Sequence, residues 1–286
     1  MTLQALYCEP DSQWLSVSRT QLELAISRSI PSMFPGCKRM VCESDDPDKV
    51  ADEMPKSDLC WSLCFSPAFI RRLFFSGFLS IAANVGGDEA PLWLLLPKLH
   101  LKRCIALFEG FHVSKKTLKI SGRYQISMNQ DFDHVMERCS ASHESSWLHP
   151  PLVAALKALK NSETVKAVSV ELWSAQNELV AGEIGVVVGA VYTSLTGFSN
   201  RVQHSGSGKV QLAALAEILR SSGVAFWDFG MSLPYKLEMG AHEIHRKEFL
   251  KLFRAGRQGH LSMVFPDERV SARSLIDALT GSQAKT

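Results

Sequence analysis

Long apolar runs are absent from this chain of 286 residues. The nearest candidate, APLWLLLPKLHL at 90–101, is short and is interrupted by Pro97 and Lys98. A membrane-spanning helix needs about 20 consecutive apolar residues, so we expect no membrane span and no membrane partner. The opening residues, MTLQALYCEPDSQWL, contain two acids and no charged-then-apolar signal pattern, which predicts a cytoplasmic protein.

Paired metal-ligand spacing is also missing. The chain has seven cysteines, but neither Cys60 and Cys64 nor Cys37 and Cys42 has a matching His or Cys pair that would complete a zinc site. HEIH at 242–245 resembles half of the HExxH motif, but its spacing is wrong, and we expect two surface histidines on a helix. We therefore interpret the cysteines as reduced, mostly structural thiols and expect no metal.

No charge of one sign dominates, since the net charge is only +2. This balance argues against a protein dominated by affinity for nucleic acid. Each local basic cluster is compatible with a solvated surface or with contacts to a phosphate backbone. The clusters are Lys98, Lys102 and Arg103; Lys115, Lys116, Lys119 and Arg123; and Arg246, Lys247, Lys251, Arg254 and Arg257.

Residues 165–255 carry the clearest pattern of elements. VKAVSVELW alternates between apolar and other residues, and LVAGEIGVVVGAVYTSL is long enough for two strands broken near Gly189. A glycine-rich loop, a helix over 209–221, the buried strand VAFWDFGM and a last helix over GAHEIHRKEFLKLFRAG follow. This order of elements is typical of a GNAT-type acyltransferase core.

We accordingly predict an α/β (α+β) fold with a smaller N-terminal domain. The N-terminal region spans 1–110, holds a small α/β domain and is partly loop over 1–58. Residues 31–55, which are rich in Pro, Asp, Ser and Lys, are predicted to be loop. The GNAT-like transferase domain is expected over 111–262, and 263–286 is expected to be a C-terminal tail.

The glycine-rich loop fits one phosphate-binding pattern and fails another. A Walker A motif requires glycine where Gln203 stands and Ser or Thr where Val210 stands. Gln203, Gly206 and Gly208 instead match QxxGxG, with which GNAT enzymes hold the pyrophosphate of coenzyme A at a helix N-terminus. A phosphate site that includes Lys209 and a plain strand-to-helix turn both remain open.

Four segments resemble the leucyl/phenylalanyl-tRNA–protein transferases. They are HVSKKTLKISGRYQISMNQDFDHVMERCSA, SSWLHPPLVAALKAL, SVELWSAQNELVAGEIGVVVGAVYTSLTGFS and FWDFGMSLPYKLEMGAHEIHRKEFLKLF, and the resemblance runs from about Leu73 to Phe253. It implies a GNAT-type domain that moves an amino acid from aminoacyl-tRNA onto the N-terminal Arg or Lys of an acceptor protein, which marks that protein for degradation. It also implies no metal and no cofactor, because the tRNA ester already carries an activated acyl group.

The resemblance also supplies candidate site residues. It implies that Asp228 orients or deprotonates the attacking amine, so Asp228→Asn is expected to keep the fold and slow transfer. Trp93 and Trp173 correspond to regions that stack on the adenine of the tRNA 3′ end, although core packing explains them equally well. The substrate-binding candidates are Trp93, Glu171, Trp173, Glu183, Gly197, Phe198, Ser199, Trp227 and Gly230, and the phosphate or tRNA candidates are Gln203, Gly206, Gly208 and Lys209.

Several positions depart from the family pattern. Gly230 stands where the family has a glutamine, and Leu195 stands where it has a glutamate. Glu183 and Gly197 replace methionines of the pocket for the carried side chain, and Trp227 replaces an aliphatic residue. These changes predict an altered preference for the transferred amino acid.

Three functions remain open from the sequence. The first is an aminoacyl-tRNA–protein transferase, expected as a monomer, with altered specificity. The second is an acetyl-CoA-dependent N-acetyltransferase, indicated by the QxxGxG loop. The third is a catalytically lapsed homologue that binds tRNA or protein N-termini, indicated by the replacements at Leu195 and Gly230.

Overall fold

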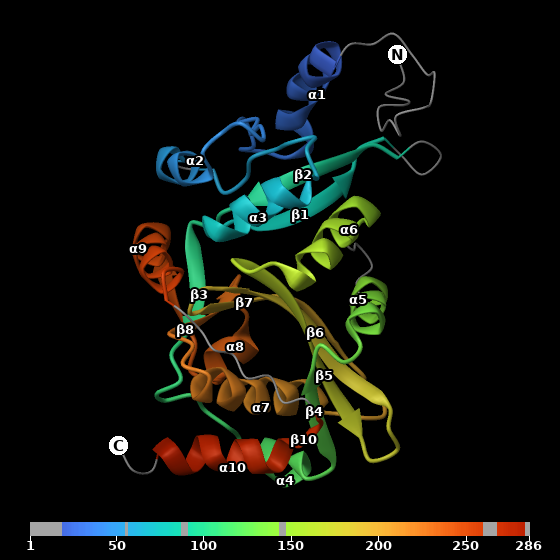
Figure 1. The fold of residues 1–286 in the computed structure, drawn as a ribbon, viewed down its shortest axis with the longest axis vertical. Helices are drawn as coiled ribbons and strands as arrows, with labels where there is room; N and C mark the ends of the chain where they lie inside the picture. The colour runs from blue at the N-terminus through green and yellow to red at the C-terminus, as the bar shows by residue number, and fades with distance from the viewer. Residues whose placement is uncertain (1–18, 55–56, 87–90, 143–146, 260–267, 284–286) are drawn as a thin grey trace. The chain divides into compact units, whose positions relative to one another are not determined.

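The structure, a computed structural model, describes residues 19–54, 57–86, 91–142, 147–259 and 268–283 (Figure 1). Contacts divide the described chain into two compact units. The first unit comprises the described residues of 1–101 together with 147–158, and the second comprises those of 102–146 and 159–286. The domain limits predicted from the sequence stay a prediction.

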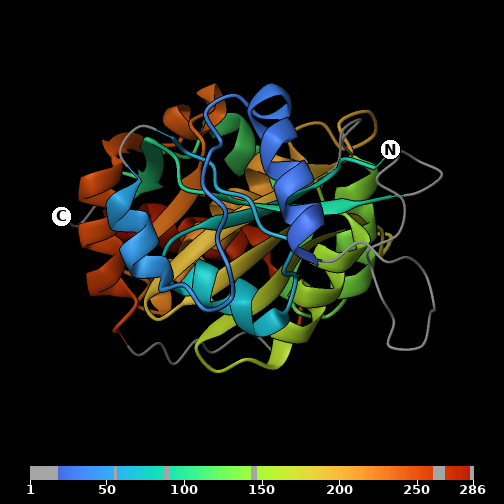
Figure 2. The same cartoon turned by 90° about the horizontal axis from the view of Figure 1, so that it is seen from above.

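The first unit is a two-stranded antiparallel ribbon covered by helices. Leu79 pairs with Lys98 at one end of the ribbon and Asn84 with Trp93 at the other. Helix α1 packs on it through Ile26 and Ile30. Figure 2 shows from above how this dark-blue helix crosses the ribbon. Its elements are α1 (Arg19–Met33), α2 (Pro47–Glu53), α3 (Pro67–Phe75), β1 (Leu79–Asn84), β2 (Trp93–Lys98) and α6 (Pro150–Ala158).

Helix α2 lies inside 31–55, which the sequence predicts to be loop, so that part of the prediction is wrong. The Asp46 carboxylate accepts a hydrogen bond from the backbone N–H of Asp48, and Pro47 occupies the first turn, where its missing N–H costs nothing. Some of the prolines and aspartates of this segment therefore begin a helix and do not mark a loop.

The second unit is built on one eight-stranded sheet. The strands are β3 (Lys102–Ala106), β4 (Tyr124–Met128), β5 (Val165–Ser174), β6 (Leu179–Val188), β7 (Val191–Ser199), β8 (Phe226–Gly230), β9 (His242–His245) and β10 (Val270–Ser271). Their spatial order is β10-β4-β5-β6-β7-β8-β3-β9, and β7–β8 is the parallel pair among antiparallel neighbours. A parallel pair requires a crossover, which helix α7 (Ser207–Ser221) supplies after the glycine loop. The predicted fold class is thus confirmed, and so is the predicted order of elements from β5 to β8.

Helices cover both faces of this sheet. The other helices of the second unit are α4 (Lys115–Ser121), α5 (Phe132–Ala141), the single 3₁₀ turn η1 (Leu159–Asn161), α8 (Pro234–Glu238), α9 (Arg246–Gly256) and α10 (Ala272–Gln283). A Cβ added at Gly182 would meet Val135 of α5, whereas the next side chain on β6, that of Glu183, contacts Gln211 of α7. Successive strand residues point to opposite faces, so α5 and α7 lie on opposite sides of β6.

One sequence expectation about secondary structure fails in the second unit. His242 and His245 lie on strand β9, which pairs with β3, and not on a helix; the helix begins only at Arg246. The Asn129 side-chain oxygen accepts the backbone N–H of Ser169, and Asp131 occupies the N-cap position of α5. Residues 270–283 form β10 and α10.

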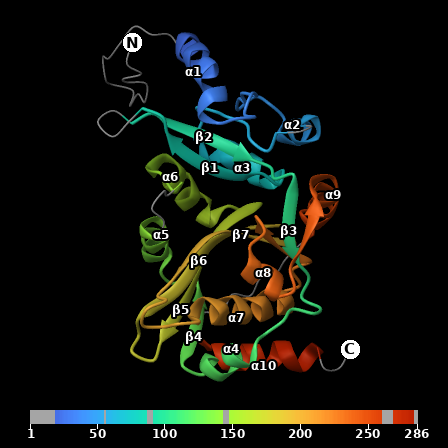
Figure 3. The same cartoon turned by 180° about the vertical axis from the view of Figure 1, so that it is seen from behind.

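Helix α10 belongs to the core of the second unit. Ala272, Ile276 and Leu279 are buried in the same apolar cluster as Leu215 of α7. Figure 3 shows α4, α7 and α10 beside one another, in agreement with their contacts. None of the helices described combines the length and apolar character needed to cross a bilayer.

We predict that Ile276→Ala lowers the free energy of unfolding by about 2–5 kcal/mol, because it leaves a cavity in a closed core. Equilibrium urea unfolding measures this loss. The control, Ser274→Ala on the exposed face of α10, should stay within about 0.5 kcal/mol of the parent protein. Equal stability of the two variants would show that α10 does not contribute to the core.

Candidate functional site

A cavity of about 1200 Å³, called here the large cavity, opens within the second unit. Its walls come from β6, from β7 and the loop after it, from the start of α7, and from α4 and α8. Among the described residues that line it, one carboxylate, Glu183, accompanies five cationic side chains. These cations are Lys116, Arg138, Arg201, Lys209 and Lys236.

A β-bulge shapes the wall formed by β6 and β7. Ile184 pairs with Thr196, but Gly185 pairs with Ser194, so Leu195 is an extra residue on β7. A bulge bends its strand and changes the direction of the side chains around it. Leu195 lines the large cavity at this bend.

Glu183 is a buried carboxyl group of the large cavity and is 4% exposed. Its Oε1 accepts hydrogen bonds from the Tyr192 hydroxyl at 2.7 Å and the Ser194 hydroxyl at 2.8 Å, and its Oε2 accepts one from Gln211 Nε2 at 3.0 Å. Burial raises the pKa of Glu183, and these hydrogen bonds and the charge of Lys236 oppose the rise. The carboxyl group is therefore held in place by three donors inside a cationic cavity.

Gly197 and Trp227 support the position of Glu183. Gly197 lies directly across from Glu183 in the β6–β7 ladder, and a Cβ at Gly197 would come within 3.2 Å of the Glu183 Cβ. Trp227 is fully buried, and its Nε1 donates to the Ser194 hydroxyl at 2.8 Å. Glu183 and Gly197, at which the resemblance implies replaced methionines, are thus adjacent and sterically linked.

Asp228 lies outside the set of residues that line the large cavity. It is fully buried and forms a bidentate ion pair with Arg103, with Nε–Oδ1 at 2.8 Å and Nη2–Oδ2 at 2.7 Å. Thr193 Oγ1 and the Gly230 backbone N–H also donate to its two oxygens. All four acceptor positions of the carboxylate are therefore occupied, so this geometry gives it no place for the proton of an attacking amine. Its catalytic role stays a prediction.

Because Arg103 is buried, it does not belong to a basic surface cluster. It is 1% exposed, and its guanidinium lies over the Phe249 ring at 4.4 Å. The assignment of Arg103 to a candidate phosphate-binding cluster is wrong, because a buried guanidinium engaged with a carboxylate cannot contact a nucleic-acid backbone.

The glycine loop places part of its pattern at the large cavity. Gly206 has a φ of +90° and precedes α7 without a side-chain cap. Gly206, Gly208 and Lys209 line the cavity, whereas Gln203 exchanges two hydrogen bonds with Asn200 in a local turn. The QxxGxG pattern therefore contributes its glycines to the site but not its glutamine.

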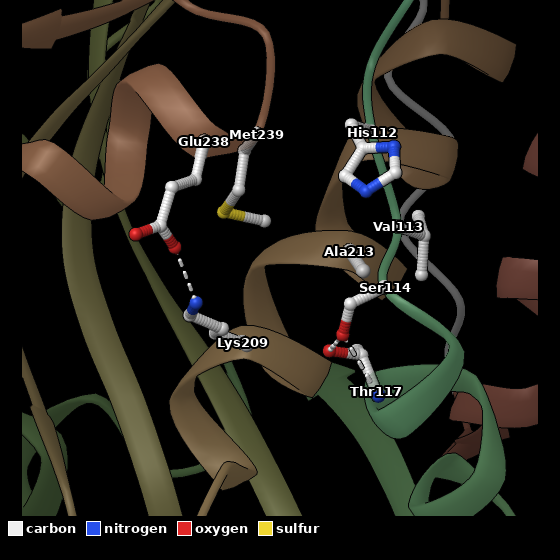
Figure 4. Close-up of a pocket in the computed structure, with 8 residues that line it drawn as sticks. All are labelled: His112, Val113, Ser114, Thr117, Lys209, Ala213, Glu238 and Met239. Atoms are coloured by element: carbon white, nitrogen blue, oxygen red, sulfur yellow. Dashed lines mark hydrogen bonds and ion pairs between the residues drawn. The ribbon is translucent and has the colours of Figure 1, made fainter.

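Lys209 lies between the large cavity and a smaller one of about 270 Å³. Its ammonium pairs with the Glu238 carboxylate at 2.7 Å, and both side chains are about half exposed. Figure 4 shows this pair facing Ser114 and Thr117 across the smaller cavity. Because the pair is exposed, a phosphate can compete with Glu238 for Lys209 at little cost.

Phe198 and Ser199 also line the large cavity, whereas Trp93, Glu171, Trp173 and Gly230 do not. Trp173 donates from Nε1 to Ser127, whose hydroxyl donates to the buried Glu171 carboxylate. The Arg269 guanidinium lies over the Trp173 ring at 3.7 Å. Trp93 belongs to the first unit, where it packs against the His149 ring. Substrate contact by these residues stays a prediction.

Two cavity residues, Gln211 and Lys236, were not selected from the sequence. Gln211 interrupts the apolar side of α7 one turn after the glycine loop, which is a weak signal of a polar site. Lys236 follows a Pro-Tyr pair and carries no signal, because only the fold shows that it is buried. Among the described residues, no group of three or more His, Cys, Asp or Glu side chains is arranged to hold a metal ion.

Comparison with known proteins supports the resemblance. A family model described as leucyl/phenylalanyl-tRNA protein transferase matches residues 105–254. The leucyl/phenylalanyl-tRNA–protein transferase of Ruegeria pomeroyi is 33% identical over 151 residues, which cover 52% of this chain and 69% of that protein. The one from Zymomonas mobilis subsp. mobilis is 32% identical over 219 residues, which cover 75% and 76%. Among solved structures, L-PGS from Bacillus licheniformis matches 64% of this chain and 55% of its own, with 14% identity and a TM-score of 0.35.

We predict that Asp228→Asn destabilises the protein by about 3–5 kcal/mol, because it leaves the Arg103 guanidinium buried without its counter-charge. This differs from the sequence-based expectation of an intact fold. The control is Asp277→Asn, which removes an exposed ion pair with Arg273 and should cost less than about 1 kcal/mol. Thermal and urea unfolding compare the two variants, and similar losses would contradict the importance of the buried pair.

We also predict a pH-dependent effect of Glu183→Gln on stability. Because the pKa of Glu183 is raised in the folded state, protonation of Glu183 stabilises that state relative to the unfolded one. This stabilisation is complete at pH values below the ordinary pKa of 4.5, and it is lost as the pH rises through the folded-state pKa. Glutamine does not titrate, so the stability of the variant relative to the parent should increase with pH across that window and then level off. Urea unfolding at a series of pH values measures the difference, and the exposed Glu163→Gln is the control. A difference that does not change with pH would contradict a raised pKa.

Proposed function

Because this chain belongs to the leucyl/phenylalanyl-tRNA–protein transferase family, we propose that it transfers an aminoacyl group from aminoacyl-tRNA to the N-terminal amine of an acceptor protein. The observation that carries this proposal is the large cavity, which combines a cationic lining with one buried carboxyl group, Glu183.

The positive charge of the residues that line the large cavity is complementary to the phosphate groups at the end of a tRNA. A nucleic acid brings phosphate groups, and the exposed cations Lys116, Arg201 and Lys209 are available to bind them. Lys115 and Lys119 are exposed on the same short helix as Lys116 and extend this basic surface beyond the cavity. In this proposal Gly206 and Gly208 let the backbone at the start of α7 approach a phosphate closely.

The proposed reaction needs no metal or cofactor. The acyl group arrives as an activated ester, and an N-terminal amine with a pKa near 8 is neutral in about a tenth of molecules at pH 7. The amine nitrogen attacks the ester carbonyl, an amide bond forms, and the bond to the ribose oxygen breaks. The proton lost by the amine goes to that departing oxygen. The cavity then has to position the two reactants and stabilise the charge on the carbonyl oxygen.

The transferred side chain in this proposal is uncharged and polar. Glu183, Gln211 and Ser194 line the large cavity. At the position of Glu183, the resemblance implies a methionine in the family. A leucine or phenylalanine side chain against this surface would remove water from polar groups without replacing its hydrogen bonds. A hydroxyl or carboxamide side chain would replace them.

The acceptor and setting follow from family membership alone. We extend the proposal to an acceptor protein with an N-terminal Arg or Lys, to its later degradation, and to a monomeric enzyme in the cytoplasm.

A second candidate function is acetyl-CoA-dependent N-acetylation. The uncapped start of α7, with Gly206 and Gly208 at the large cavity, is an arrangement that also suits a pyrophosphate. A third candidate is a lapsed enzyme that only binds aminoacyl-tRNA, since Leu195 and Gly230 replace two polar family residues.

We predict that the parent protein transfers Ser, Thr, Asn or Gln from charged tRNA more efficiently than Leu or Phe. Glu183→Met should shift the ratio of kcat/KM values toward Leu and Phe by about 10-fold or more, because it restores an apolar surface. The assay follows radiolabelled amino acid from a panel of charged tRNAs onto a peptide that begins with Arg.

Glu163→Met, an exposed substitution, is the matched control and should leave the preference unchanged. A parent preference for Leu and Phe would contradict the polar pocket. Acetylation of the peptide from acetyl-CoA would favour the second candidate. Binding of an aminoacyl-adenosine amide without any transfer would favour the third.

A further inference from the structure

A buried lysine lies in the large cavity at the end of β8. Lys236 is 8% exposed, and its Nζ donates hydrogen bonds to the Phe229 carbonyl at 2.7 Å and the Met231 carbonyl at 2.8 Å. Both carbonyls follow Asp228 within three residues along the chain. Lys236 is therefore a cation of the site whose position is fixed by two hydrogen bonds.

Gly230 makes this arrangement possible. Its φ of +69° lies in the left-handed region, which costs glycine little and other residues more. The turn at Gly230 brings the carbonyls on either side of it to one ammonium group. The position where the family has a glutamine side chain thus holds, in this chain, a backbone turn that binds Lys236.

Charged groups from several strands face the Lys236 ammonium. Burial lowers its pKa, and the neighbouring Arg103 lowers it further, whereas Cys104, Asp228 and Glu183 favour the charged form. The two backbone carbonyls take two of its three N–H groups, so one N–H is left to donate to a molecule in the cavity.

Resting on the transfer reaction proposed above, we propose that Lys236 is a catalytic residue that donates this third hydrogen bond to the carbonyl oxygen of the aminoacyl ester. As the amine nitrogen bonds to the carbonyl carbon, the π electrons move to the oxygen, and the ammonium stabilises the negative charge that results. The charge returns to the carbonyl when the bond to the ribose oxygen breaks, and the departing oxygen takes the proton of the amine. Lys236 stays protonated throughout.

The other four cations of the large cavity suit this task less well. Lys116, Arg201 and Lys209 are exposed, and Arg138 is partly exposed over the Phe198 ring. Exposed side chains lose orientation and are screened by water, whereas stabilisation of an oxyanion requires a donor that is fixed before the reaction. Lys236 is the buried member of the five and is held by two hydrogen bonds.

The first test is Lys236→Met, measured in single-turnover transfer at saturating aminoacyl-tRNA. The rate constant should fall by roughly 10²–10³-fold, the loss typical of removing one oxyanion donor. The Kd for a stable aminoacyl-adenosine amide should change by less than about 3-fold, because the oxyanion does not exist in that ligand. Lys49→Met, an exposed substitution in the first unit, is the control and should change neither value. Thermal unfolding establishes that each variant is folded.

The second test uses the parent protein and Lys236→Arg, and it does not depend on the stability of Lys236→Met. The single-turnover rate of the parent should rise as the acceptor amine loses its proton and then fall as Lys236 loses its own, at a pH below the ordinary lysine value of 10.5. An arginine keeps its proton over this range, so Lys236→Arg should retain activity and lack the alkaline fall.

Each result of these tests leads to one conclusion. A normal rate in folded Lys236→Met would overturn the proposal and leave the transferase function intact. A loss confined to the Kd would also overturn it and would make Lys236 a binding residue. Absence of transfer by the parent protein from every charged tRNA would overturn the transferase function itself and this role with it.

Discussion

The buried ion pair between Arg103 and Asp228 connects the three strands next to the candidate site. Arg103 comes from β3, Asp228 from β8, and Thr193 of β7 donates to the same carboxylate. Removing either charge would leave the other buried without a partner, which is far more costly than losing an exposed pair. Because Asp228 also accepts the Gly230 N–H, the pair fixes the turn at the end of β8, and that turn in turn fixes Lys236.

The positions at which the resemblance implies departures from the family are connected in space. Glu183 occupies its place because Gly197 opposite it has no side chain, and Lys236 is held by carbonyls that converge because Gly230 adopts a positive φ. Each of these two buried polar side chains therefore depends on a nearby glycine. In the proposed transferase, this linkage supports a site adapted to a different transferred amino acid.

The ionisable side chains of the large cavity differ in how deeply they are buried. Its exposed cations lie where phosphate groups can reach them, whereas Glu183 and Lys236 are buried and held by hydrogen bonds. Ionisable groups with burial-shifted pKa values are common at sites that perform chemistry, because removal from water both shifts the pKa and strengthens electrostatic interactions. In the proposed reaction, the exposed cations bind the tRNA and the buried lysine takes part in the chemistry.

The sequence by itself determined the periodic elements and the family. Alternation in VKAVSVELW, the break near Gly189 and the glycine loop before a helix are local patterns, and β5, β6, β7 and α7 follow them. What only the tertiary structure decided depends on contacts between residues far apart in the chain. The partner of Asp228 lies 125 residues away, β9 is a strand because β3 offers it an edge, and α10 is core because α7 covers it. The sequence gives no sign that Lys236 is buried, since a lysine is ordinarily exposed. The fold buries it by bringing its ammonium to the carbonyls of Phe229 and Met231.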